Sequence, residues 1–271
     1  MKASLFIFLL TLAGFSQAQK PEGLSYDILC TYRLDYQPDS TDVKSRKSEE
    51  MLLFLSKSHS LFKSKNMYLR DSASAKDETT NNFGSMSFAL SVQTNFQYNI
   101  VKDTTGKITT IDYVHRDRYE YIEPRQSFNW SVSEDTSTIN GIKCQKAETN
   151  FSGRNWIAWF SMDIPSTDGP YKFNGLPGLI IKISDSSGYY TFLLTQYVNK
   201  KITVAFPKSQ PPIKVTKLKF YTTLKYFNEN RYEIEQLRGV TFTSGQEQFK
   251  KRFEELAKKN NNPIELITIS K

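Results

Sequence analysis

The sequence predicts an α+β protein that is mainly antiparallel β, and three observations support this. Apolar and polar residues alternate with a period of two over many short stretches, which is typical of half-buried strands. Polar turns join these stretches, and no strand alternates with a helix as parallel βαβ units require. The spacing becomes helical only after Thr216. We therefore expect a twisted meander sheet or half-barrel with C-terminal helices packed on it.

The strand patterns begin early in the chain. Residues Tyr26–Tyr36 alternate, and Met51–Leu55 with Ser60–Lys63 is a predicted hairpin. Turn residues then separate further predicted strands. These are Val92–Val101, Lys107–His115, Tyr119–Ile122, Phe128–Val132, the strand with Cys144, Trp156–Met162 and Ile202–Phe206.

The segment Asn66–Ala89 has no clear period. Met67 and Tyr68 can begin a short helix, whereas Ser72–Gly84 is polar, small and charged. We expect a mobile excursion there, and long loops of this kind are places where binding functions occur.

The stretch Phe173–Asp185 contains the strongest turn signal. Pro177 fixes its own φ and Gly178 accepts a positive φ, so we predict a type II turn over Leu176–Leu179. The residues that follow alternate as a strand, turn back and return as Tyr189–Tyr197.

The C-terminal part, about residues 214–262, is predicted to be helical. A capping-box pattern starts at Ser244. Phe249, Phe253 and Leu256 then share one helix face, and the helix should end near Asn260.

The first 18 residues have the pattern of a secretory signal peptide, with cleavage after Ala18. The apolar run Leu5–Phe15 is too short to anchor the chain in a bilayer. Residues 19–271 are expected to form a single domain, whose formal charge is +7 because Lys2 is removed from a total of +8. We expect an exported protein, periplasmic or extracellular, that does not span a membrane.

Residues 175–180 spell the motif GLPGLI, formed by Gly175, Leu176, Pro177, Gly178, Leu179 and Ile180. Upstream, Asn140–Ala147 is similar to a cysteine-containing block of the GLPGLI family, and Gly153-Arg154 also fits its pattern. The chain therefore resembles this family of secreted proteins from Bacteroidetes-type bacteria, most specifically over Asn140–Asp185. The family has no assigned activity, so the resemblance implies an exported class and no mechanism.

Cys30 and Cys144 lie on predicted strands with apolar neighbours. An exported environment permits a disulfide between them. The alternative is two separately buried thiols, which is common for cysteine. The resemblance supports Cys144 more than Cys30, which slightly favours separate thiols.

Little in the sequence points to catalysis. The nucleophile-elbow, zinc-helix and phosphate-loop motifs are absent, and two histidines, His59 and His115, exclude a His-rich metal site. We predict no catalytic residue, metal or cofactor. We also expect no nucleic-acid partner, since no recognition motif is present. Asp163, Asp168 and Asp185 are interpreted as turn residues.

Arg154, Trp156 and Trp159 are the candidate ligand-binding residues. A guanidinium beside Trp156 can clamp a carboxylate or phosphate. The favoured alternative is structural: Arg154 binds carbonyl groups of the Gly169–Pro170 loop or stacks on a tryptophan, and both tryptophans belong to the core.

Three functions remain open. The first is an exported, non-enzymatic envelope protein that binds an apolar or amphipathic, lipid-like ligand, or an envelope protein. The aromatic strands and the lack of a nucleophile–base pattern favour it. The second is a secreted hydrolase with dispersed carboxylates, which needs two acids about 5–9 Å apart in a cleft. The third is a purely structural or interaction protein, in which the signature block only builds the fold.

Overall fold

The computed structural model describes residues 23–80, 83–125, 128–207, 210–242 and 245–269. The predicted signal peptide and Ser244 of the predicted capping box lie outside the described residues. In the described part of the chain, no helix is long and apolar enough to cross a membrane.

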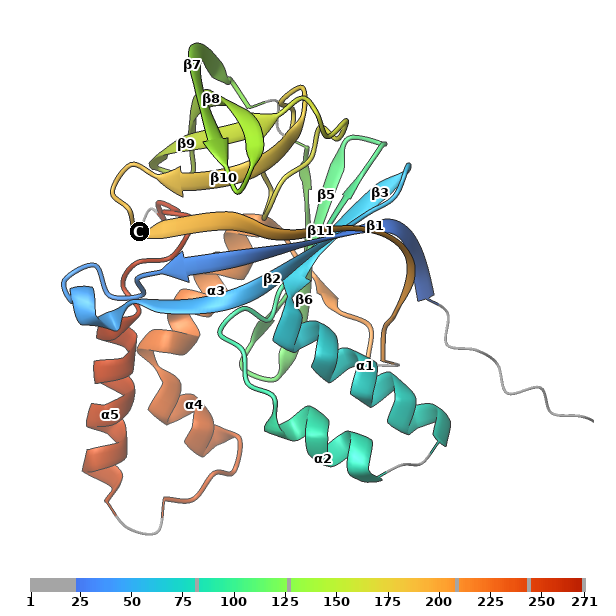
Figure 1. Cartoon of the computed structure of the whole chain (residues 1–271). Helices are drawn as coiled ribbons and strands as arrows, with labels where there is room; N and C mark the ends of the chain where they lie inside the picture. The colour runs from blue at the N-terminus through green and yellow to red at the C-terminus, as the bar shows by residue number, and fades with distance from the viewer. Residues whose placement is uncertain (1–22, 81–82, 126–127, 208–209, 243–244, 270–271) are drawn as a thin grey trace, which may run out of the picture.

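The strands confirm the predicted α+β class with a mainly antiparallel sheet. They are β1 (Gly23–Tyr36), β2 (Lys47–Leu55), β3 (His59–Ser64), β4 (Asn99–Asp103), β5 (Lys107–Val114), β6 (Asp117–Pro124), β7 (Ser131–Ile139), β8 (Ile142–Phe151), β9 (Arg154–Ser161), β10 (Leu179–Asp185), β11 (Tyr190–Ala205) and β12 (Ile213–Lys214). Within the described residues they form one open sheet of twelve strands, in the order β12-β6-β5-β4-β3-β2-β1-β11-β10-β9-β8-β7. Two antiparallel meanders, β1 to β6 and β7 to β11, thus join where β1 pairs with β11 (Figure 1).

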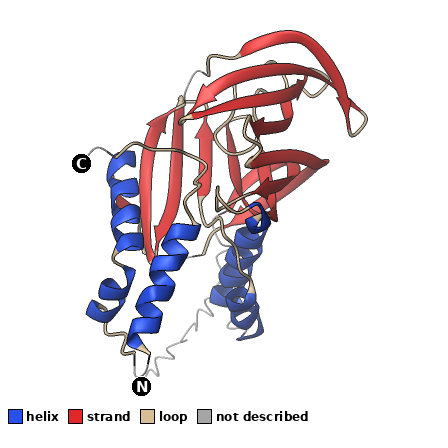
Figure 2. Ribbon diagram, turned by 90° about the vertical axis from the view of Figure 1, so that its left-hand side faces the viewer, coloured by secondary structure: helices blue, strands red, loops and turns tan. Residues whose placement is uncertain are grey.

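The helices gather at one end of the molecule, and β7 to β10 rise at the other end (Figure 1). Figure 2 shows the same separation from a second direction. The α-helices are α1 (Lys65–Thr80), α2 (Phe83–Ser91), α3 (Lys217–Glu229), α4 (Arg231–Leu237) and α5 (Gln246–Lys259), and a short 3-10 helix spans Val43–Ser45. Of the C-terminal helices, α3 packs on β5 and β6, as predicted, and α4 and α5 pack on α3 and on each other.

The mobile excursion predicted over Ser72–Gly84 is wrong, because most of it belongs to α1 and α2. Helix α1 buries Met67, Asp71 and Ala75, which are spaced by four residues and therefore share one face. Asp71 accepts a hydrogen bond of 2.6 Å from the buried Lys63 Nζ on β3. A polar helix face is thus buried through an ion pair, which hydrophobic periodicity does not reveal.

Two strand predictions also need correction. The strand expected at Val92–Val101 begins only at Asn99, because the Phe96 amide bonds the Thr94 hydroxyl instead of a neighbouring strand. The two strands expected at Tyr189–Tyr197 and Ile202–Phe206 are one long strand, β11.

The turn at the GLPGLI motif is tighter than predicted. The Gly178 amide donates to the Leu176 carbonyl over 2.8 Å, which closes a three-residue turn centred on Pro177. The Leu179 amide donates instead to Ile164. The predicted type II turn is therefore not formed, and Gly178 lies directly against the Ser161 carbonyl.

Replacing Gly178 with Ala should lower the free energy of unfolding by about 3 kcal/mol. A Cβ at this position would lie 2.1 Å from the Ser161 carbonyl oxygen, a backbone atom that cannot rotate away. Gly106→Ala is the control: Gly106 has φ +84° but open space around it, so the cost should be about 1 kcal/mol. Equal losses in urea denaturation would show that the close approach to Ser161 does not matter.

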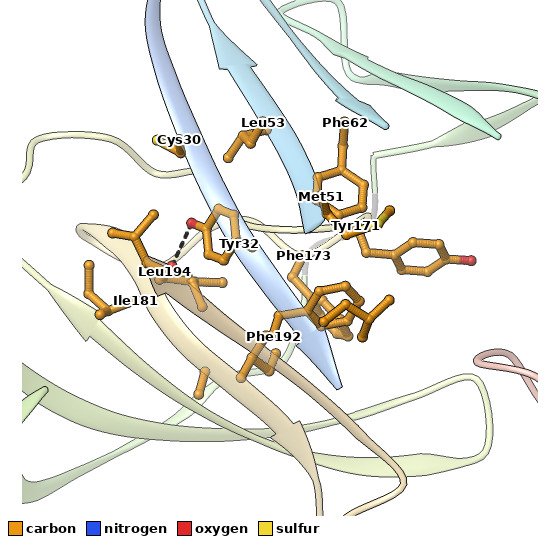
Figure 3. Close-up of a cluster of buried hydrophobic side chains, with 14 of the residues drawn as sticks. Cys30, Tyr32, Met51, Leu53, Phe62, Tyr171, Phe173, Ile181, Phe192 and Leu194 are labelled. Atoms are coloured by element: carbon orange, nitrogen blue, oxygen red, sulfur yellow. Dashed lines mark hydrogen bonds between the residues drawn. The ribbon is translucent and has the colours of Figure 1, made fainter. Parts of the chain in front are cut away.

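The main hydrophobic core lies where the two meanders join. Tyr32, Leu53, Phe62, Phe173 and Phe192 pack there, as Figure 3 shows. The Tyr32 hydroxyl donates to the carbonyl of Ile180 over 2.7 Å, which ties the GLPGLI motif to β1.

The cysteines Cys30 and Cys144 are both buried in this core and both are free thiols. Of the two alternatives that the sequence leaves open, the structure has separate thiols. Burial raises the pKa of each thiol, so neither is activated as a nucleophile.

Candidate ligand-binding groove

Arg154 lies at the start of β9 and is 7% exposed. Its guanidinium donates to Asp185 Oδ2 over 3.1 Å and to Asn262 Oδ1 over 2.5 Å. It also donates to the carbonyl oxygens of Pro263 (2.7 Å) and Ile264 (3.2 Å). The carbonyl groups that it binds therefore belong to the C-terminal segment, and not to the Gly169–Pro170 loop.

The tryptophans also build structure. Trp156 is fully buried, and its ring centroid lies 4.7 Å from that of Phe173. Trp159 is half-buried against the core. Neither tryptophan nor Arg154 lines the groove described below. The residues singled out from the sequence are thus not gathered around that hollow.

A groove runs between α3, the segment 94–98 and the C-terminal segment 260–269; we call it the α3 groove. Its inner part has a volume of about 290 Å³ and its outer part about 880 Å³. The two parts adjoin each other, because they share lining residues, among them Phe96, Tyr190, Tyr221 and Leu224.

Aromatic side chains dominate the inner part of the groove. Its aromatic lining is Phe96, Tyr98, Tyr113, Tyr121, Tyr171, Tyr190, Phe220 and Tyr221. Tyr98 is 8% exposed, and its hydroxyl makes no hydrogen bond within the described part of the chain. A buried hydroxyl without a partner is costly, so this atom is suited to bind a polar ligand group.

Asp112 brings a carboxyl group into the same inner part. It lies half-buried on β5, and its Oδ1 accepts the Tyr113 amide over 2.7 Å. No ion pair found among the described residues involves it. Burial raises the pKa of Asp112 to about 7, and Lys172 acts in the opposite direction.

An ionic cluster lies beside Tyr121 and Tyr171, and its member Glu265 lines the groove. The cluster consists of the buried Glu123, Lys172 and Glu265 and the half-buried Lys217. Lys172 Nζ lies 2.6 Å from both Glu123 Oε2 and Glu265 Oε1. Lys217 Nζ lies 3.1 Å from Glu123 Oε1 and 2.6 Å from Glu265 Oε2. Two cations thus face two anions, and together they join β6, α3, the loop before β10 and the C-terminal segment.

Glu265 is the most strongly held member of the ionic cluster. Besides the two lysines, the hydroxyls of Tyr171 and Ser152 donate to it over 2.5 and 2.9 Å. Burial alone would raise the pKa of Glu265, but Lys172 and Lys217 lower it to about 2. Its carboxylate is therefore ionised and fully occupied.

Sequence reasoning missed Tyr98, Asp112 and Glu265. The sequence does give one indication for Asp112. It lies two and four residues after the buried Thr110 and Ile108 on β5, so all three lie on the same face of the strand. A carboxylate on the apolar face of a strand indicates a special environment. Glu265 carries no such signal, because it follows the last helix in an irregular segment.

Comparisons with known proteins found one family model that matches part of the chain and two similar solved structures. The model of a family described as proteins of unknown function (Porph_ging) matches residues 97–182, a range that contains the GLPGLI motif, Tyr98 and Asp112. No curated protein matches the sequence.

Two solved structures of PNGF-II, in space groups P21 and C2, are similar to this chain. Both are 11% identical, with TM-scores of 0.49 and 0.50 respectively. Each match covers 73% of this chain and 32% of the PNGF-II chain. The chain therefore spans about a third of the length of those structures, and the likeness concerns the fold alone.

Proposed function

We propose that the protein is an exported, non-enzymatic binding protein whose α3 groove takes an amphipathic ligand. The observation that carries this proposal is the groove itself, two adjoining hollows of which the inner one is lined by aromatic side chains. Binding sites for small molecules are typically concave and largely apolar, with a few convergent polar groups. Here the polar groups are the Tyr98 hydroxyl and the Asp112 carboxyl.

The outer part of the groove suits the apolar portion of such a ligand. Leu224, Ala257, Pro263, Ile267 and Ile269 contribute apolar surface along it. An acyl chain or a similar group laid along these residues would leave water, and each buried methylene contributes about 0.8 kcal/mol. The polar end would then reach the inner part.

The N-terminal sequence supports the exported location. Residues 1–18 combine a basic start, a short apolar run and a small-x-small end. The resemblance to the GLPGLI family of secreted proteins supports the same location, in the periplasm or outside the cell.

A neutral apolar dye, N-phenyl-1-naphthylamine, should bind the mature protein with one saturable site. Leu224→Trp should weaken this binding at least about tenfold, because Leu224 lines both parts of the groove and the indole would fill them. Fluorescence titration measures the affinity.

Leu218→Trp is the matched control for this experiment. Leu218 lies on the same helix, is 55% exposed and lines neither part of the groove, so the dye affinity should stay unchanged. Equal affinity of both variants would place the dye elsewhere. Absence of saturable binding would oppose a ligand-binding function and favour an envelope-protein partner.

A secreted hydrolase is the second candidate, and one observation favours it. Asp112 and Glu265 line the same cavity, and their pKa values are moved in opposite directions. Such a pair is the pattern of a general acid and a base. We place the hydrolase second because four donors already occupy the Glu265 carboxylate. Hydrolysis of a substrate by the wild type that is abolished in Asp112→Asn would put the hydrolase first.

A further inference from the structure

We infer that the head group received by the inner part of the α3 groove is a cationic amine, held by Asp112 among tyrosine rings. This inference rests on the proposed function and specifies the chemistry of its ligand.

The first argument is the unpaired charge of Asp112. Its one hydrogen bond found in the described part of the chain comes from the Tyr113 amide. Lys172 is the nearby cation that acts on it, but the Lys172 ammonium already contacts Glu123 and Glu265 at 2.6 Å. A half-buried carboxylate that lines an aromatic cavity and has no cation beside it is unfavourable, so a ligand ammonium would supply the missing charge.

The second argument is the ring system around that carboxylate. Tyr98, Tyr121 and Tyr221 line the same cavity. Tyrosine faces attract cations, and the attraction grows when water is excluded. The unpartnered Tyr98 hydroxyl can in addition accept an N–H of the ammonium. An anionic head group would instead meet Asp112 and the ionised Glu265.

Burial raises the pKa of Asp112 into the neutral range, and the charge of Lys172 opposes this shift. The pKa of Asp112 is about 7, that of Tyr121 is about 12, and that of Glu265 is about 2. The titratable and charged groups around Asp112 come from the segment before β4, from β5, β6, α3, the loop before β10 and the C-terminal segment. They are Tyr98, Tyr113, Tyr121, Tyr221, Lys172 and Glu265.

The test compares three eight-carbon probes by titration calorimetry on the mature protein at about pH 8.5, where Asp112 is ionised. We expect octylammonium to bind about tenfold more tightly than octanol, and octanoate most weakly. Asp112→Asn should make octylammonium and octanol equal. Asp117→Asn, an exposed carboxylate on the same β5–β6 hairpin, should preserve the preference. At about pH 5.5, where Asp112 is protonated, the wild type should lose most of its preference for octylammonium over octanol.

The outcomes separate the two proposals. Equal binding of octylammonium and octanol by the wild type overturns the cationic head group but keeps the binding function. A preference for octanoate also overturns it. A preference that survives Asp112→Asn places the cation elsewhere and overturns the role of Asp112. If no probe binds, the binding function itself fails.

Discussion

Replacing Glu265 with Gln should lower the free energy of unfolding at pH 7 by about 3 kcal/mol. The folded-state pKa of Glu265 is about 2, compared with an ordinary value of 4.5. Each unit of that difference corresponds to about 1.4 kcal/mol of stabilisation of the ionised form. The variant also leaves Lys172 and Lys217 with a single carboxylate, Glu123, between them.

The sign of the pH dependence follows from the lowered pKa. The stabilisation from Glu265 is fully present above pH 4.5 and is lost as the pH falls toward about 2. The stability gap between the wild type and Glu265→Gln should therefore narrow between pH 7 and pH 2. Urea denaturation across this range, followed by tryptophan fluorescence, measures the gap.

Glu229→Gln is the control for this prediction. Glu229 lies 3.9 Å from Lys225 on the exposed side of α3, and such a surface pair contributes less than about 1 kcal/mol. Its substitution should have little effect at any pH. A Glu265→Gln gap that stays constant down to pH 2 would show that the charge of Glu265 is not the stabilising feature.

Local chemistry in the sequence predicts much of the fold correctly. Asn140 and Gly141 form the β7–β8 turn with φ values of 50° and 80°, which is why these two residue types occur there. The Thr216 hydroxyl accepts the Lys219 amide and begins α3, where the spacing becomes helical. In both places one or two residues determine the backbone without help from distant segments.

The features that the sequence did not reveal depend on distant pairing. The join of the two meanders pairs Tyr36 on β1 with Tyr190 on β11, residues that lie far apart in the sequence, and no local pattern specifies that partner. The sequence predicts a short helix from Met67 but not the full length of α1, because the buried face of this helix includes Asp71, which pairs with Lys63. The charged Asp71 interrupts the apolar period, and its burial is tolerated only because the fold brings Lys63 beside it.

The candidate site was hidden for the same reason. Lys172, Lys217 and Glu265 look like ordinary surface charges in the sequence, yet they meet in one ionic cluster in which Lys172 and Glu265 are buried. The tyrosines of the inner part of the groove come from the segment before β4, from β5, β6 and β11, from the loop before β10 and from α3. Arg154 stands out in the sequence, but apart from Asp185 its partners lie more than a hundred residues away, at Asn262 and the two residues after it.

Replacing Arg154 with Met should lower the free energy of unfolding by about 3–5 kcal/mol. Asp185 would remain buried without its cation, and the breaking of a buried pair by removal of one partner has this magnitude. The stability of Arg154→Lys should lie between that of the wild type and that of Arg154→Met. An ammonium keeps the positive charge, but it cannot reach all four acceptors as the planar guanidinium does. Arg33→Met is the control, since Arg33 pairs with Asp35 at an exposed site.

The same substitution should loosen one wall of the α3 groove. Arg154 holds the carbonyl oxygens of Pro263 and Ile264, and Pro263 and Glu265 line the groove. The amide of Leu266 bonds Ser152 at 2.9 Å, so its hydrogen exchange reports whether the segment stays docked. We expect faster exchange there in Arg154→Met and weaker binding of the neutral dye. The exchange rate of the Leu266 amide in Arg154→Met is compared with the rate expected from the lower global stability alone. If the two rates agree, Arg154 acts only as the counterion of Asp185, and the ionic cluster alone holds the groove wall.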